Sequence, residues 1–102
     1  MTILRADEPL RVNPRCLLTE LGDGTGVVLN LDTKFYFTLN TTGVLLWKEL
    51  SASASGAPPK ALAEKLVEHF LVEIDVAVTD VVAILQTMAE EDLVHPSGAT
   101  AP

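Results

Sequence analysis

The sequence has little of what would indicate an oxidising compartment or nucleic-acid binding. Its 102 residues include a single cysteine, Cys16, which cannot form an internal disulfide. Only seven Lys and Arg stand against fourteen Asp and Glu, so the formal net charge is −7. Proteins that bind nucleic acid normally have the opposite balance, and we therefore expect no nucleic-acid partner.

Long hydrophobic runs are also missing. The apolar stretches are short, as in residues 81–85, whereas a membrane-spanning helix needs about 20 such residues. Two acidic residues and Pro9 interrupt the N-terminal segment before an apolar run develops, so we expect no secretory signal. These features predict a cytoplasmic protein without a membrane partner.

Patterns that would indicate an enzyme or a metal centre are absent as well. His69 and His95 lie far apart and have no nearby ligands at the spacing that structural zinc uses, so we expect neither metal nor cofactor. The glycine-rich run 22–26 precedes an expected strand, whereas a phosphate-binding loop should open a helix. We interpret this run as a turn and Cys16 as a small buried hydrophobe, and we expect no catalytic residue.

What the sequence does contain is enough apolar material, 48% of its residues, for the core of one domain. Three short segments in the first 40 residues have the composition of strands, namely 16–21, 27–31 and 35–39. The turn 22–26 and the connection 32–34 separate them. This order predicts a three-stranded antiparallel meander.

The third of these segments is rich in aromatic residues. Because side chains alternate along a strand, Phe35, Phe37 and Leu39 should share one face, which we expect to lie toward the helices. Tyr36 and Thr38 should then lie on the open face.

Helical periodicity replaces the strand pattern after residue 40. Asn40 is a favourable N-cap for a helix over 41–50, and Pro59 can occupy the first turn of a second helix. Asp75 is the expected cap of a third helix over 76–91. The residues expected on the buried face of the second helix are Leu62, Leu66, Val67 and Phe70.

Together these elements predict an α+β, winged-helix-like fold, with a three-stranded antiparallel sheet followed by three helices. We expect a flexible N-terminal arm over residues 1–14, the folded domain over 15–94 and a flexible C-terminal tail over 95–102.

The third helix has an apolar arc of roughly half its circumference, wider than the ~100° that core packing requires. One interpretation is that this helix is simply well buried. The other is that the edge formed by Ala77, Val81, Ile84 and Met88 lines a groove for a partner. The central stripe comprises Val78, Val81, Val82, Leu85, Met88 and Ala89.

A motif after the aromatic strand adds a family resemblance. The run Leu39-Asn40-Thr41-Thr42-Gly43, followed by Trp47, resembles the signature of the PqqD family of small leader-peptide-binding proteins, also called RiPP recognition elements. The resemblance extends over about residues 15–94, and the spacing around Asp80 is also similar to that in the small partner proteins of lasso-peptide clusters. The family commonly has glycine where Lys34 and Asp92 stand here.

The resemblance implies a non-catalytic peptide chaperone. A ribosomally made precursor would dock its leader as an extra strand between the third strand and the third helix. The protein would present it to a modifying enzyme of the radical SAM type or to a leader peptidase, and a homodimer is conceivable. The expected peptide-binding residues are Lys34, Phe35, Tyr36, Phe37, Thr38, Ala77, Asp80, Val81, Ile84, Thr87 and Met88.

Two alternatives stay open. A winged-helix regulator would bind DNA, but the helix expected over 76–91 has no Lys or Arg with which to neutralise phosphates. A scaffold without a peptide ligand would dimerise through its edge strand or a helix.

Overall fold

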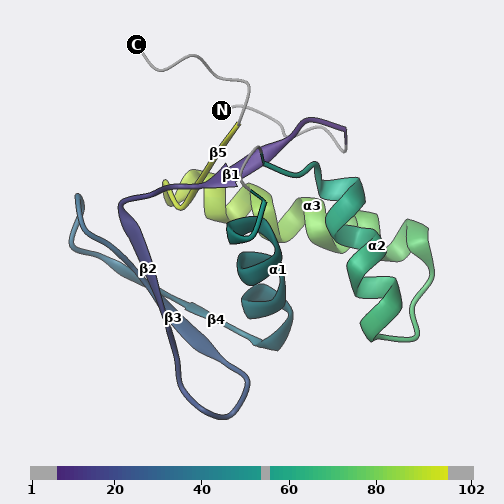
Figure 1. The fold of residues 1–102 in the computed structure, drawn as a ribbon, viewed down its shortest axis with the longest axis horizontal. Coiled ribbons are helices and arrows are strands. Elements are labelled where there is room, and N and C mark those ends of the chain that lie inside the picture. Colours follow the sequence, from purple (N-terminus) through teal and green to yellow (C-terminus); the bar gives the residue numbers. More distant parts are fainter. Residues whose placement is uncertain (1–6, 54–55, 97–102) are drawn as a thin grey trace.

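The computed structural model describes residues 7–53 and 56–96, which form two small sheets and three helices (Figure 1). In chain order the elements are β1 (Leu10–Val12), β2 (Cys16–Glu20), β3 (Gly26–Asn30), β4 (Tyr36–Leu39), α1 (Thr41–Ser51), α2 (Pro59–His69), α3 (Ile74–Glu90) and β5 (Val94–Pro96). No helix among these residues is long and apolar enough to cross a bilayer.

The larger sheet has the order β2-β3-β4, and both pairs are antiparallel. Its side chains alternate between the core and the outside, as in β3, where Val28 is fully buried between the half-buried Val27 and Leu29. The helices cover the face that carries Val28 and Leu39. The α+β fold with a three-stranded antiparallel sheet and three helices is thus confirmed.

A second, two-stranded sheet pairs β1 with β5, and the sequence pattern does not reveal it. Leu10 in β1 is fully buried and exchanges two main-chain hydrogen bonds of 2.8 Å with Ala57. Both strands have only three residues, too few for a recognisable period, and their partners are far apart in the sequence. The expected arm and tail therefore contribute strands at 10–12 and 94–96, and residues 1–6 and 97–102 lie outside the described residues.

The helix N-termini agree with the expected caps only in part. Asn40 caps α1 as predicted, since its side-chain oxygen accepts a hydrogen bond of 2.9 Å from the Gly43 N–H. The predicted cap Asp75 is wrong, because α3 begins at Ile74 and Asp75 lies inside its first turn. Its carboxylate there still lies near the positive end of the helix dipole.

Helix α1 packs closely on the end of β4. A methyl group at Gly43 would lie 3.2 Å from the Leu39 side chain, so glycine permits this approach. Leu46 and Trp47 are buried in the core, as expected from their spacing. Helices α2 and α3 pack against each other, and Leu62, Leu66, Val81 and Leu85 belong to their shared buried core. Val67 and Phe70 do not lie on the buried face of α2 as expected, since they are 36% and 41% exposed and Phe70 lies at the C-cap.

Within residues 7–53 and 56–96, two residues other than glycine adopt left-handed backbone conformations. Lys34 has φ 68° in the turn before β4, and Asp92 has φ 62° just after α3. These are the two positions at which glycine is common in the family that the sequence resembles. Such φ values are costly for a residue with a Cβ, which accounts for that preference.

Candidate functional site

Strand β4 has an open edge. It lies at the end of the sheet order β2-β3-β4, and β3 is the one described strand that pairs with it. The Asn30 N–H donates to the Phe35 carbonyl at 2.9 Å, so within this register the main chain of Phe37 is directed at β3. The alternate residues Tyr36 and Thr38 therefore direct their N–H and C=O groups at the open edge, where a further strand can pair.

A groove runs beside this edge, between β4 and α3. Its middle is a hollow of about 180 Å³ between Phe37 and Thr38 of β4 and Ile84 and Thr87 of α3. Asn40 and Gly43, at the start of α1, also line it. Two further hollows, described next, adjoin it at its two ends. We call the three hollows together the β4–α3 groove.

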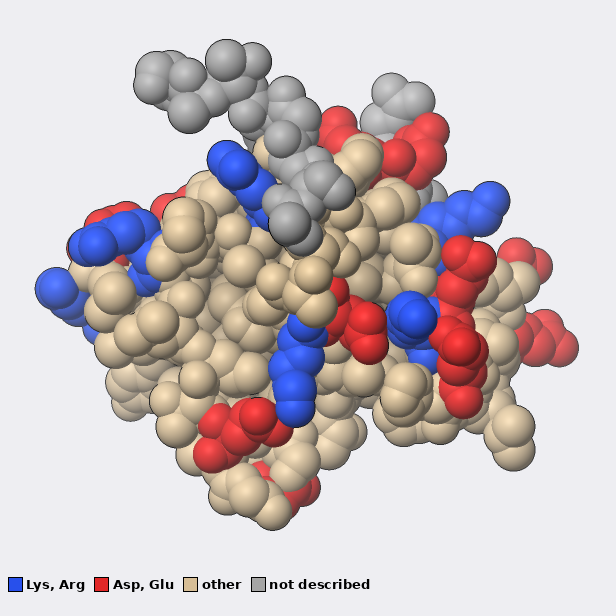
Figure 2. All heavy atoms as spheres, viewed as in Figure 1, with Lys and Arg blue, Asp and Glu red and all other residues tan. Residues whose placement is uncertain are grey.

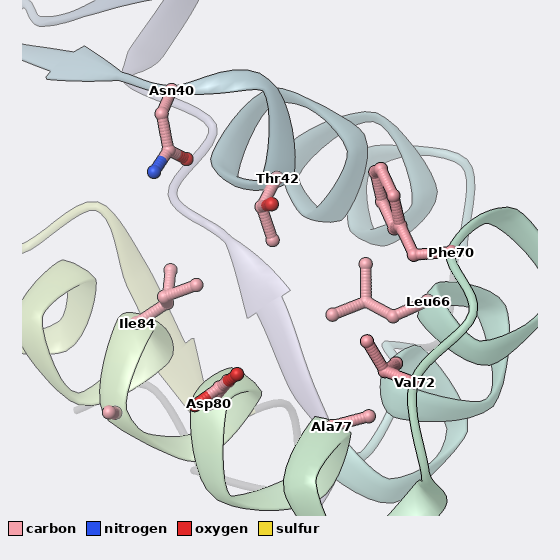
Figure 3. Close-up of a pocket in the computed structure, with 9 residues that line it drawn as sticks. Asn40, Thr42, Leu66, Phe70, Val72, Ala77, Asp80 and Ile84 are labelled. Atoms are coloured by element: carbon pink, nitrogen blue, oxygen red, sulfur yellow. The ribbon is translucent and has the colours of Figure 1, made fainter.

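The groove opens into a larger hollow of about 490 Å³ where the three helices approach one another (Figure 3). The walls are mainly apolar, with Asp80 as the charged side chain among them. Ile84 lines this hollow and the middle one, so the two adjoin at this side chain. The labelled lining residues are Asn40 at the N-cap of α1, Thr42 of α1, Leu66 of α2, Phe70 and Val72 after α2, and Ala77, Asp80 and Ile84 of α3.

At its other end the groove reaches a hollow of about 150 Å³ beneath the start of β4. Phe35 and Phe37 line one side of it, and residues 90–93 line the other. Phe37 also borders the middle hollow, so these two hollows adjoin at Phe37. Acidic side chains thus stand at both ends, Asp80 at one and Glu90 to Asp92 at the other.

The expected site residues fall into two groups. Phe37, Thr38, Asp80, Ile84 and Thr87 line the groove with exposed or half-buried side chains. Tyr36 and Phe35, which are 73% and 75% exposed, line the hollow at the start of β4, and Lys34 occupies the turn before them.

The remaining three residues belong to the core. Val81 is fully buried and borders none of the three hollows, while Ala77 and Met88 are 1% exposed and reach a hollow only at their surfaces. Three of the four residues of the edge that was expected to line a partner groove, Ala77, Val81 and Met88, are therefore core residues. Ile84 is the fourth, and its half-buried side chain lines the hollows beside β4. That a partner binds along this edge stays a prediction.

Two expectations for this region need correction. Phe35 does not pack beneath the helices, because β4 begins only at Tyr36 and the turn at Lys34 leaves the Phe35 ring exposed. The contribution of α2 was also missed: Leu66, Phe70 and Val72 line the largest hollow, although nothing in the local sequence relates them to β4. Only the packing of α2 on α3 brings them there.

Among the described residues, the two titratable groups with clearly shifted pKa values, Cys16 and Asp23, line none of the three hollows. Burial, together with the nearby carboxylates of Asp92 and Asp32, raises the pKa of the Cys16 thiol, which disfavours the reactive thiolate. Asp23 accepts hydrogen bonds from Thr25 in the exposed turn 22–26, and they lower the pKa of its carboxyl. Within 7–53 and 56–96, no three His, Cys, Asp or Glu gather where they could hold a metal ion.

The sequence over the groove matches a known family model. Residues 25–94, which include all of β4 and α3, match the model described as coenzyme PQQ synthesis protein D (PqqD). The chain belongs to the PqqD family. This confirms the resemblance that the run from Leu39 to Trp47 suggested. No curated protein matches the sequence.

Two solved structures share the architecture of this PqqD-family protein. One is TbiB1 in complex with the TbiA(beta) leader peptide, with a TM-score of 0.72, 21% identity, and coverage of 89% of this chain and 99% of that chain. At that identity the match shows the fold. The other is lasso peptide synthetase B1 complexed with the leader peptide, with a TM-score of 0.71, 25% identity, and coverage of 86% and 99%.

Proposed function

We propose that this PqqD-family protein is a non-catalytic chaperone that binds the leader segment of a ribosomally made precursor peptide. The observation that carries the proposal is the open edge of β4 beside a row of adjoining hollows along α3. Two structures of the same fold contain leader peptides, which supports the same ligand class for this chain.

The edge can bind a peptide by strand addition. A leader in extended conformation would exchange main-chain hydrogen bonds with Tyr36 and Thr38, whose N–H and C=O groups are directed outward. Because strand side chains alternate, the leader residue opposite Phe37 would point into the middle hollow. The main chain would supply affinity and the hollows would supply selectivity.

The lining of the groove indicates which side chains would fit. The large hollow, with Leu66, Phe70 and Ile84 in its walls, suits a large apolar side chain. Asp80 at its rim would favour a neutral or basic neighbour over an acidic one.

In this role the protein has no catalytic step of its own. It would hold the precursor for a modifying enzyme of the radical SAM type or for a leader peptidase, in the cytoplasm. The lack of Lys and Arg in α3 argues against the alternative in which this helix binds DNA.

A titration of ¹⁵N-labelled protein with a synthetic leader tests the proposal. The leader would come from a short reading frame beside the gene for this chain. We expect saturable shifts of the amides of residues 34–39 and of α3 residues that face the groove, with small changes in the turn 22–26. Shifts spread over β2 instead, or dimerisation without shifts on adding peptide, would favour a scaffold that pairs through its edge strands.

A further inference from the structure

The hollow at the start of β4 combines aromatic side chains with carboxylates. It has a volume of about 150 Å³, and Phe35 and Phe37 line one side of it while Glu90 and Glu91 line the other. The Phe35 side chain is 75% exposed and lies outside the buried core cluster. We call this hollow, defined by these four residues, the aromatic–acidic hollow. An exposed aromatic ring near acidic groups in a concave surface suits a cationic side chain.

The helix side of the aromatic–acidic hollow continues the face of α3 that lines the middle hollow. Ile84, Thr87 and Glu91 follow at intervals of three and four residues, the spacing that places side chains on one face of a helix. Ile84 and Thr87 line the middle hollow, and Glu91, the C-cap of α3, lines the aromatic–acidic hollow. A peptide that follows this face therefore passes from an apolar wall to a carboxylate.

The acidic residues at this end of α3 stand where they disfavour the helix. Glu90, Glu91 and Asp92 lie at the negative end of the helix dipole, and the last turn contains no basic residue. The His95 imidazole lies 3.5 Å from the Asp92 carboxylate, but among the described residues Glu90 and Glu91 form no ion pair. A contribution to helix stability thus does not account for these two carboxylates, whereas a bound cation would lower their mutual repulsion.

Several acidic residues elsewhere have a basic neighbour. Acidic and basic side chains are interspersed over the α2 end of the molecule (Figure 2), and there Lys65 lies 3.7 Å from Glu68. Lys48 likewise lies 3.3 Å from Glu20. Glu90 and Glu91 differ from these residues in that they lack such a neighbour and line a hollow.

The cation that fits the aromatic–acidic hollow is an organic one. Within residues 7–53 and 56–96, no three His, Cys, Asp or Glu come together where they could hold a metal ion. Phe35 and Phe37 instead offer apolar surface along which the methylene stem of a lysine or arginine can lie, with its charged head at the carboxylates.

The leader that we propose to pair with β4 can bring such a side chain to the hollow. Side chains alternate along a strand, so every second leader residue would point toward the groove. If the residue opposite Phe37 points into the middle hollow, the residue two positions from it, toward the start of β4, points into the aromatic–acidic hollow.

We propose that the aromatic–acidic hollow binds a lysine or arginine side chain of the leader at this position. The inference rests on the proposed leader-binding function and adds a charge requirement to it. Leaders with an acidic residue at this position would be rejected, because Glu90 and Glu91 would repel it.

The test exchanges charge between the protein and the leader. Glu91→Lys reverses one charge of the hollow, and it also places a base at the C-terminal end of α3, which favours the folded helix. The matched control is Glu64→Lys, at an exposed position of α2 that lines none of the three hollows. Both variants change the net charge of the chain by the same amount.

The probes are two synthetic peptides. One is the leader from the short reading frame beside the gene for this chain. Nuclear Overhauser effects from the Phe37 ring identify the leader residue in the middle hollow, and the second residue from it toward Phe35 is the position under test. The other peptide has glutamate at that position.

We expect Glu91→Lys to weaken binding of the native leader about tenfold at low ionic strength, and Glu64→Lys to stay within about twofold of wild type. The glutamate leader should bind wild type about tenfold less tightly than the native leader, and Glu91→Lys should recover about fivefold of that loss. These differences should shrink at high ionic strength. Fluorescence anisotropy measures each affinity.

Equal affinities of Glu91→Lys and Glu64→Lys for the native leader would overturn the proposal, as would a native leader with neither Lys nor Arg at the identified position. A glutamate leader that binds no better to Glu91→Lys than to wild type would overturn it too, since the loss would then not come from this pair of charges. In each of these cases the wild-type protein still binds its leader. Failure of the wild type to bind any leader would instead contradict the proposed function, so the two failures are distinguishable.

Discussion

The side-chain amide of Asn13 donates a hydrogen bond of 2.8 Å to the main-chain carbonyl of Asp92, a residue 79 positions away. Asn30 donates to the same carbonyl at 3.3 Å. Both asparagines are almost fully buried. The end of α3 is thereby tied to β3 and to the segment between β1 and β2, which fixes the wall of the groove relative to the sheet.

The first prediction concerns this junction. Asn13→Ala should lower the free energy of unfolding by about 1–3 kcal/mol, because it removes two hydrogen bonds and leaves the Arg15 N–H without its side-chain acceptor. Urea denaturation measures the change. Lys60→Ala, at an exposed position of α2, is the control and should change stability by less than about 0.5 kcal/mol. An equally small effect in Asn13→Ala would contradict the structural role of the amide.

The second prediction concerns the left-handed turn before β4. Lys34 has φ 68°, a conformation that costs a residue with a Cβ about 1–2 kcal/mol. Lys34→Gly should therefore raise the free energy of unfolding by about 0.5–1 kcal/mol, part of the relief being offset by the greater entropy of the unfolded chain. Thermal unfolding reports the difference.

Lys34→Ala is the matched variant, since it removes the charge and keeps the Cβ. It should show no such gain. If alanine stabilised the protein as much as glycine, the effect would come from charge and not from backbone conformation.

The third prediction tests the groove. Ile84 is half-buried and lines both the large and the middle hollow. Ile84→Glu should weaken leader binding about tenfold or more, because a carboxylate would replace an apolar wall, while the fold is largely retained. Fluorescence anisotropy with a labelled leader measures the loss.

Val76→Glu provides the control, since it makes a comparable change on the first turn of the same helix at a residue that is 51% exposed and outside the three hollows. It should leave affinity unchanged. If circular dichroism showed that Ile84→Glu is unfolded, Ile84 would be a core residue and the peptide-binding groove would have to lie elsewhere.

The fourth prediction concerns Cys16. Its pKa is raised above the ordinary value of 9.0, first by burial and then by the carboxylates of Asp92 and Asp32. The thiol should therefore react more slowly with a disulfide reagent at pH 8 than the same residue in the urea-unfolded chain. Rapid labelling of the folded protein would show that the site is open to solvent.

The raised pKa of Cys16 also makes the stability of the fold depend on pH in a defined direction. Because the folded state holds the thiol proton more tightly than the unfolded state, its contribution to stability is present below pH 9 and is lost as the pH rises above that value. Unfolding curves at pH 8 and pH 10 for wild type and Cys16→Ala check this direction, since only the wild type should lose this contribution.

Local patterns in the sequence were sufficient to predict the three helices and the three strands of the larger sheet. Strand-like composition between turn residues predicted β2, β3 and β4, three- and four-residue spacing predicted the three helices, and the side-chain chemistry of Asn40 predicted the cap of α1. These succeed because periodicity and capping depend on residues within a few positions of one another. The run from Leu39 to Trp47 also indicated the family that residues 25–94 confirm.

Contacts between distant segments were decided by the tertiary structure alone. The pairing of β1 with β5, the junction of Asn13 with Asp92 and the contribution of Phe70 to the large hollow have no local signature. The sequence determined which faces of α3 and β4 are apolar. Packing decided which part of the α3 arc is core, at Val81, and which part faces the groove, at Ile84, because burial depends on the neighbours that the fold brings against each side chain.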